Sequence, residues 1–144
     1  PPIWLGGDVE PAVRRAARLA DAWLAAPTTA FDVVTSFIAA FREERDSLGL
    51  ATDVKCPIVR ECFIGRNAAH AREGSRAPLL ADFEPAFDEF AASRFLIGDA
   101  VEVRDQLQEF AETTGSDHFL MRMQWPGLDQ GEALANIERI GKLI

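Results

Sequence analysis

Residues that commonly bind metals or act as nucleophiles are scarce in this sequence. The 144 residues include no tyrosine, two histidines and two cysteines. No His, Cys and Asp residues stand close together in the pattern that a zinc site or a Cys–His nucleophile needs. The sequence therefore predicts no metal site and no cysteine-based catalysis.

The two cysteines, Cys56 and Cys62, stand six positions apart, an even spacing, in an apolar, β-branched stretch. This spacing puts both side chains on one face of a strand, where they do not face each other as a disulfide requires. We therefore predict reduced, buried thiols, which are typical of a cytoplasmic protein.

Positive charge and long hydrophobic runs are also lacking. Fifteen Lys and Arg stand against 23 Asp and Glu, for a net charge of −8 and a pI near 4.7. This balance argues against nucleic acid and anionic membranes as partners. No apolar run approaches the roughly 20 residues of a membrane helix. The 48 % of hydrophobic residues suffices for one core, so we expect one domain or a piece of a larger one.

Short apolar runs alternate with longer amphipathic segments, a pattern typical of βα units around a parallel sheet. We count four units, with strands predicted at residues 3–5, 22–25, 54–64 and 118–123. The residues expected to begin or end the helices are Asp8, Thr28 or Thr29, Gly49, Asn67, Asp99 with Glu102, Gly115 and Asp129. We interpret residues 74–98, where the periodicity weakens, as an insertion in the third unit, packed by Phe83, Phe87, Phe90 and Phe95.

Four parallel strands with helices on one side leave the other sheet face exposed, so something must cover it. A doubly wound sheet places helices on both faces, whereas a barrel adds four more units and closes. The last predicted strand favours a barrel: Phe119, Met121 and Met123 form an apolar face, and the other face becomes polar at Arg122 and Gln124. The start, Pro1 to Gly7, has no initiator methionine and reads as a strand entered directly, so we expect that an N-terminal part is missing.

Several segments resemble the flavin-dependent luciferase-like monooxygenase family. They are PPIWLGG at residues 1–7, AVRRAARLADAW at 12–23, FLIGD at 95–99 and HFLMRMQWPG at 118–127. The resemblance implies an α/β fold, with residues 1–144 forming one region: the C-terminal half, about four βα units, of a luciferase-like (β/α)8 TIM barrel. It implies a flavin oxidoreductase or monooxygenase that uses reduced FMN or a deazaflavin, coenzyme F420, and acts on a small-molecule substrate.

The same resemblance implies the positions of the cofactor-binding residues. Gly6, Gly7, Asp8 and Val9 match the turn that holds the flavin phosphate at a helix N-terminus, where backbone N–H groups favour an anion. The family often has Ser or Thr here, and the carboxylate of Asp8 would repel a phosphate unless it caps the helix and points away. We therefore also consider an ordinary glycine turn with an N-cap.

Arg122, Gln124 and Trp125 match the end of the family's last strand, which faces the flavin ring and the substrate. Gln124 would hydrogen-bond the ring edge, Arg122 would offset charge on a reduced flavin, and Trp125 would form a wall. An ion pair between Arg122 and Glu61, and a packed turn at Trp125, are the structural alternatives. No catalytic residue is assigned.

Because the first half of the barrel is absent, we expect the chain alone to be inactive. It would function by associating with the missing half or in a homodimer. The alternative is a non-catalytic half-barrel that buries its open face against a second copy of itself. A third interpretation is a doubly wound phosphate-binding domain, which requires helices on both sheet faces.

Overall fold

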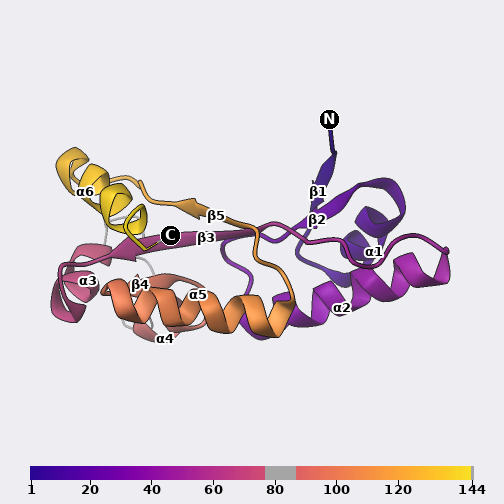
Figure 1. Ribbon diagram of the computed structural model, residues 1–144, viewed down its shortest axis with the longest axis horizontal. Helices are drawn as coiled ribbons and strands as arrows, with labels where there is room; N and C mark the ends of the chain where they lie inside the picture. Colours follow the sequence, from indigo (N-terminus) through magenta and orange to yellow (C-terminus); the bar gives the residue numbers. More distant parts are fainter. Residues whose placement is uncertain (77–86, 144) are drawn as a thin grey trace. The chain divides into compact units, whose positions relative to one another are not determined.

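A computed structural model describes residues 1–76 and 87–143 (Figure 1). Its elements, in chain order, are β1 (Trp4–Gly6), α1 (Glu10–Leu19), β2 (Ala22–Leu24), α2 (Phe31–Ser47), β3 (Ile58–Ile64), α3 (Ala68–Ser75), α4 (Phe87–Ala92), β4 (Leu96–Gly98), α5 (Ala100–Thr114), β5 (Phe119–Arg122) and α6 (Gln130–Ile140). The chain divides into two compact units. Unit 1 comprises Pro1–Arg60 and Phe110–Leu120, and unit 2 comprises Glu61–Glu109 and Met121–Ile144.

Unit 1 contains neighbouring strands in the order expected for consecutive βα units. β1 pairs in parallel with β2, with Trp4 opposite Ala22. A parallel bridge between Ala25 and Ile58 connects the end of β2 to β3, and the Ile58 N–H donates to the His118 carbonyl at 2.9 Å. Side-by-side pairing in this order is what the alternating sequence pattern predicts.

The core of unit 1 lies between this sheet and the helices α1 and α2. Its buried side chains are Val13, Ala16, Ala17, Trp23, Ala25, Val34, Ile38, Phe41, Cys56 and Ile58. Small residues on α1 allow it to pack closely against its neighbours. Gly49 follows the end of α2 with a φ of +67°, a conformation that glycine adopts readily. On the other side of α1, Arg14 forms ion pairs with Glu10, Glu43 and Glu44.

Several predicted boundaries in unit 1 are wrong, among them that of β1, which is Trp4–Gly6 and not residues 3–5. The N-cap of α1 is Val9 rather than Asp8, and α2 begins at Phe31 after Ala30, not at Thr28 or Thr29. The strand predicted from residue 54 begins at Ile58, because Pro57 directly precedes it and proline cannot donate to a strand ladder.

Unit 2 contains a strand that the count of four units omitted. β4 pairs in parallel with the second half of β3, with Cys62 opposite Leu96 and Ile64 opposite Gly98. Its three residues lie inside the segment interpreted as an insertion, and a run this short has no recognisable periodicity. The helix start after β4 is as predicted, since Asp99 and Glu102 form a reciprocal capping box.

The aromatic residues of the insertion pack together as predicted where the structure describes them. Phe87 and Phe95 are buried with Ala91, and the rings of Phe90 and Phe95 lie 5.5 Å apart, edge to face. Phe83 lies outside the described residues.

The sequence pattern predicts an inward face of Ala133, Leu134, Ile137 and Ile140 for α6, and the structure confirms only Ala133 and Ile140. Its cap is as expected, because the Asp129 side chain accepts from the Glu132 N–H at 3.1 Å. However, Leu134 and Ile137 are half exposed, and Asn136 is completely buried in their place.

No helix among the described residues is long and apolar enough to span a bilayer.

Both cysteines are free and buried, as predicted. Burial raises the pKa of Cys56, and it raises the pKa of Cys62 to about 12. We predict that at about pH 8 iodoacetamide alkylates Cys62 about a thousandfold more slowly in the folded chain than in urea, and Cys56 also more slowly, because burial leaves so little thiolate. Mass spectrometry against time gives the two rates. Equal rates would show that the thiols are accessible in the fold.

Candidate functional site

The first group of predicted site residues forms the turn between β1 and α1 in unit 1. The Trp23 indole Nε1–H donates to the Gly7 carbonyl at 2.9 Å, which ties the turn to β2. A Cβ at Gly7 would lie 2.5 Å from the Cβ of Ala12, so no larger residue fits without a shift. Gly6, Asp8 and Val9 are exposed. The turn is therefore held firmly on one side and open to solvent on the other.

This open side presents the N-terminus of a ten-residue helix. The N-cap residue is Val9, and its apolar side chain makes no hydrogen bond to the first turn of α1. Pro11 has no N–H, and the Ala12 N–H donates to the Val9 carbonyl at 2.9 Å, so the open end of α1 offers the N–H of Glu10, where the helix dipole adds partial positive charge. The first-turn carboxylate of Glu10 is engaged by Arg14 at 2.8 Å. An anion such as a phosphate suits this arrangement.

The second group of predicted site residues follows β5 in unit 2. Arg122 forms an ion pair with Glu61 of β3, the alternative that the sequence left open. The Glu61 side chain is 11 % exposed and that of Arg122 is 54 % exposed. The Glu61 Oε2 is buried and has no hydrogen-bond partner in the part of the chain that the structure describes. The pair thus leaves an acceptor on Glu61 and an exposed cation on Arg122.

Trp125 and Gln124 lie just beyond this ion pair. Trp125 is buried against Phe63, with 6.0 Å between ring centroids, so the packed turn predicted as an alternative is present. Its indole Nε1–H is nevertheless buried without a partner among the described residues. Gln124 is exposed, and its Nε2 approaches the Leu128 carbonyl only at 3.5 Å. Buried tryptophan N–H groups usually have partners, so this one is an open position for an acceptor.

The two predicted groups belong to different units. Within unit 1 the structure brings together Gly6 to Val9, and within unit 2 it brings together Arg122 and Trp125 with Glu61 and Phe63. No cluster of three or more potential metal ligands occurs among the described residues.

Sequence reasoning missed the polar residues that support these groups. The sequence pattern places Trp23 on a predicted strand and indicates nothing more about it. An indole on a strand beside a glycine turn can, however, donate a hydrogen bond to a carbonyl of that turn. Asn136 donates to the Cys62 carbonyl at 2.8 Å and accepts from the Ile64 N–H at 2.7 Å, so it extends the pairing of β3. Asn136 stands three positions after Ala133 and therefore on the same face of the helix. A polar residue on this inward face was the sequence signal for a buried hydrogen-bonding side chain.

Comparisons with known proteins connect this arrangement to one class of fold. No protein-family model matches the sequence, and no curated protein sequence matches it significantly. Solved structures do match. The monooxygenase RslO1 from Streptomyces bottropensis matches with a TM-score of 0.81 and 16 % identity, over 100 % of this chain and 47 % of that chain.

Two further neighbours bind or use the two cofactors considered above. The coenzyme F420-dependent tetrahydromethanopterin reductase from Methanopyrus kandleri matches with a TM-score of 0.70 and 14 % identity, over 99 % of this chain and 50 % of that one. The oxygenating constituent of 3,6-diketocamphane monooxygenase from Pseudomonas putida, solved with FMN, matches with a TM-score of 0.65 and 16 % identity, over 98 % and 46 %. The chain thus spans about half the length of these neighbours, and its fold is that of half of a luciferase-like (β/α)8 barrel.

Proposed function

We propose that this chain provides the C-terminal half of the barrel in a luciferase-like oxidoreductase that uses FMN or coenzyme F420. The exposed N-terminus of α1, whose N-cap Val9 makes no side-chain hydrogen bond, is the observation that carries the proposal. Both cofactors contain a phosphate, and this turn has the backbone geometry that favours one. Neighbours that bind FMN or depend on coenzyme F420 support the same assignment.

The cofactor's phosphate would lie against the backbone of Gly6, Gly7, Asp8 and Val9. Within unit 2 by itself, at the end of β5, Arg122 would offer an exposed cation to a bound ring system. The unpartnered Trp125 N–H would donate to a bound acceptor, and the Gln124 amide is free to turn toward a ring edge. The bound cofactor would supply hydride transfer or oxygen activation, while these residues would orient it and exclude water.

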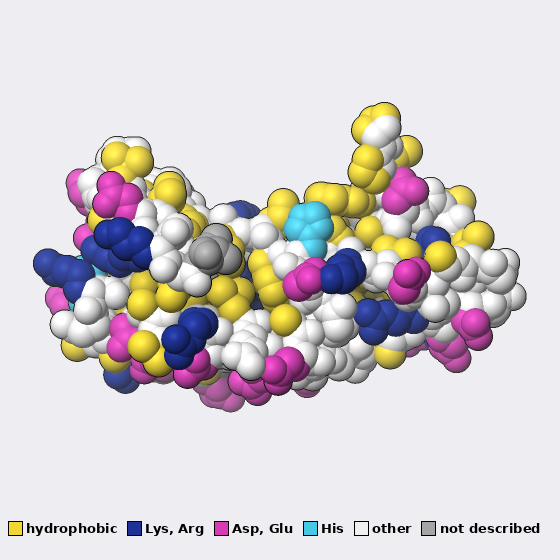
Figure 2. Space-filling view, viewed as in Figure 1, with side chains coloured by type: hydrophobic (Ala, Val, Ile, Leu, Met, Phe, Trp, Pro, Cys, Tyr) yellow, Lys and Arg dark blue, Asp and Glu magenta, His cyan; other side chains and the backbone are white. Residues whose placement is uncertain are grey.

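The active form requires a partner that covers the open side of the sheet in unit 1. Helices α1 and α2 cover one face, whereas Trp4 and Leu120 on the strands each remain 37 % exposed. The space-filling view also shows hydrophobic side chains at the surface (Figure 2). Because a barrel buries the inner face of its strands, we propose that the other barrel half covers these residues and that this chain alone turns over no substrate.

The same exposed residues favour a second candidate, a non-catalytic half-barrel that associates with a copy of itself. Sedimentation equilibrium with and without FMN separates the two. A dimer that persists at nanomolar concentration and does not bind FMN supports the self-associating half-barrel. A chain that binds FMN, whatever its mass, supports the cofactor-binding half.

Asp8 provides the sharpest test of the phosphate assignment. Its exposed carboxylate stands beside the proposed phosphate and repels it. We expect Asp8→Ser to tighten FMN binding about three- to tenfold, because it removes that charge and adds a hydroxyl donor. Fluorescence titration with FMN, and with riboflavin, which has no phosphate, measures the change.

The matched control is Asp32→Ser, since Asp32 is also exposed and lies in the first turn of α2. It should leave the FMN affinity unchanged, and Asp8→Ser should leave the riboflavin affinity unchanged. Equal tightening by both variants would mean that only net charge matters and that the turn does not hold the phosphate.

A further inference from the structure

The hydrogen bond from the Trp23 indole to the Gly7 carbonyl determines which way one peptide of the turn between β1 and α1 faces. Peptide units are planar and almost always trans, so the carbonyl of Gly7 and the N–H of Asp8 point in opposite directions. The Gly7 carbonyl points toward Trp23, which is completely buried in unit 1. The N–H of Asp8, an exposed residue, therefore points away from the core.

The indole and the turn are both fixed in place by their neighbours. Trp23 lies on β2 opposite Leu5 of β1, and its ring packs edge to face against Phe37 of α2, with 5.7 Å between ring centroids. Gly7 lies so close to α1 that a Cβ there would be 2.5 Å from the Cβ of Ala12. The packing thus holds the donor and the acceptor 2.9 Å apart.

Without this hydrogen bond, the peptide between Gly7 and Asp8 would be free to turn over. Glycine restricts its backbone less than any other residue, so rotation of the peptide that follows it costs little. The reversed peptide would present the Gly7 carbonyl oxygen on the outer side of the turn in place of the Asp8 N–H. An acceptor would then stand where an anion needs a donor.

The outward N–H of Asp8 is available to a ligand. Within residues 1–76 and 87–143, the hydrogen bonds of this turn run from the Trp23 indole to Gly7 and from the first turn of α1 to the Val9 carbonyl, and none of them uses the Asp8 N–H. An anion at the N-terminus of α1 would therefore gain a hydrogen bond from a donor that already points outward.

We propose that Trp23 is a positioning residue for the anion site: its indole orients the peptide between Gly7 and Asp8 so that the Asp8 N–H donates to the cofactor's phosphate. Trp23 does not touch the phosphate, because it is completely buried. The inference rests on the proposed function and adds to it a specific backbone donor and the side chain that orients this donor. Its effect is confined to ligands that carry the anion.

Replacing the indole N–H alone tests this role. The benzothiophene analogue of tryptophan, introduced in place of Trp23 only, keeps the bicyclic ring and has sulfur where the N–H was. We expect it to weaken FMN binding about three- to tenfold, the effect of one lost hydrogen bond. Riboflavin has no phosphate, so its affinity should not change. The same analogue in place of Trp4, an exposed residue of β1, is the control and should change neither affinity.

Trp23→Phe is a second variant, which retains an aromatic ring in the core and lacks the donor. It should weaken FMN binding to a similar degree and leave riboflavin binding unchanged. In both variants, the shift that FMN causes at the Asp8 amide of the ¹⁵N-labelled chain should be smaller than in the unmodified chain. Circular dichroism shows whether each variant is folded.

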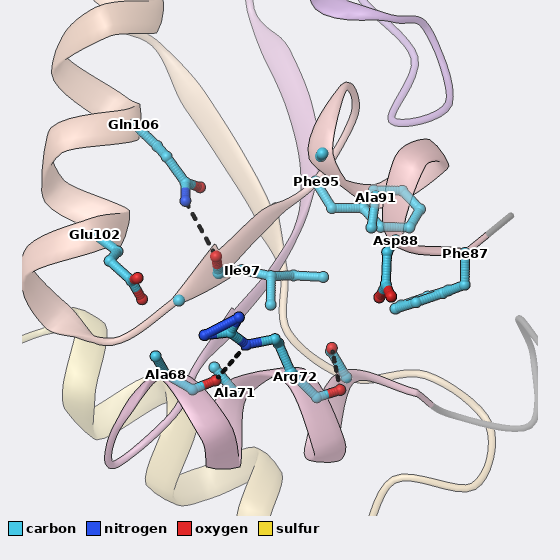
Figure 3. Close-up of a pocket in the computed structure, with 13 residues that line it drawn as sticks. Ala68, Ala71, Arg72, Phe87, Asp88, Ala91, Phe95, Ile97, Glu102 and Gln106 are labelled. Atoms are coloured by element: carbon cyan, nitrogen blue, oxygen red, sulfur yellow. Dashed lines mark hydrogen bonds between the residues drawn. The ribbon is translucent and has the colours of Figure 1, made fainter.

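A cavity in unit 2 is another place where a flavin would fit. It has a volume of about 460 Å³ and is lined by residues of α3, α4, β4 and α5, among them Ile97 and Gly98 (Figure 3). Known small-molecule sites have volumes of about 300 to 1,000 Å³. The described lining includes neither Trp23 nor the turn, so FMN bound there would shift the amides of Ile97 and Gly98 and would be insensitive to the Trp23 variants.

The possible results separate this inference from the proposed function. If FMN shifts the amides of the turn and both Trp23 variants bind FMN as tightly as the unmodified chain, Trp23 has only a structural role and the inference is overturned, while the proposed function stands. Equal weakening of FMN and riboflavin would also overturn the inference alone. If FMN shifts only Ile97 and Gly98, or shifts no amide, both are overturned.

Discussion

Replacing Asn136 by alanine is expected to lower the free energy of unfolding by about 3 kcal/mol. The Asn136 side chain is completely buried, and its amide satisfies both the Ile64 N–H and the Cys62 carbonyl. Alanine leaves both of these backbone groups without their hydrogen-bond partner in the interior of unit 2, and its smaller side chain also creates a cavity. Urea unfolding followed by circular dichroism measures the loss.

Glu138→Ala is the control for this substitution. Glu138 lies on the same helix but is exposed, so the free energy of unfolding should change by less than about 0.5 kcal/mol. If Asn136→Ala were as mild as this control, α6 would not be anchored to β3 through the asparagine. Arg139, which donates to the Ile64 carbonyl at 2.8 Å, would then be the principal contact.

The second large effect is expected at Gly65, which directly follows β3. A Cβ there would lie 2.4 Å from the Ala71 N and 2.7 Å from the Asn67 carbonyl oxygen. Both are backbone atoms and cannot rotate away, so Gly65→Ala forces α3 to move relative to β3. We expect a loss of about 3 kcal/mol or more in the free energy of unfolding, at the upper end of overpacking effects.

Gly6→Ala is a matched control, because Gly6 also stands at the end of a strand. The nearest atom to a Cβ at Gly6 is the Leu24 carbonyl oxygen at 3.8 Å, an ordinary contact. This substitution should change stability by less than about 1 kcal/mol. A similar loss in both variants would indicate a general intolerance of alanine at strand ends rather than the contact of Gly65 with α3.

Elements with strong local signals were predictable from the sequence. The capping box at Asp99, the cap at Asp129 and the glycine that ends α2 each depend on residues a few positions apart, and all three have the predicted form. The predicted alternation of buried and exposed side chains at the end of the last strand is also confirmed. Met123 is buried, and its neighbours Arg122 and Gln124 are exposed. Local chemistry determines these features, so one sequence suffices to find them.

Features that depend on contacts between distant residues were not predictable. β4 is recognised only through its pairing with β3, and the inward face of α6 is determined by backbone groups of β3 that Asn136 satisfies. The turn before α1, where Val9 and not Asp8 is the N-cap, is tied through Gly7 to Trp23, sixteen positions along the chain. The family resemblance supplied the site residues.

We propose above that the turn between β1 and α1 binds the phosphate of a flavin or deazaflavin cofactor. Amide chemical shifts of the ¹⁵N-labelled chain, recorded during a titration with FMN, test it most directly. We expect the largest shifts at Gly6, Gly7, Asp8 and Val9, and we expect that riboflavin at the same concentration does not produce them. FMN shifts that leave these four amides in place, or that riboflavin reproduces in full, would contradict it.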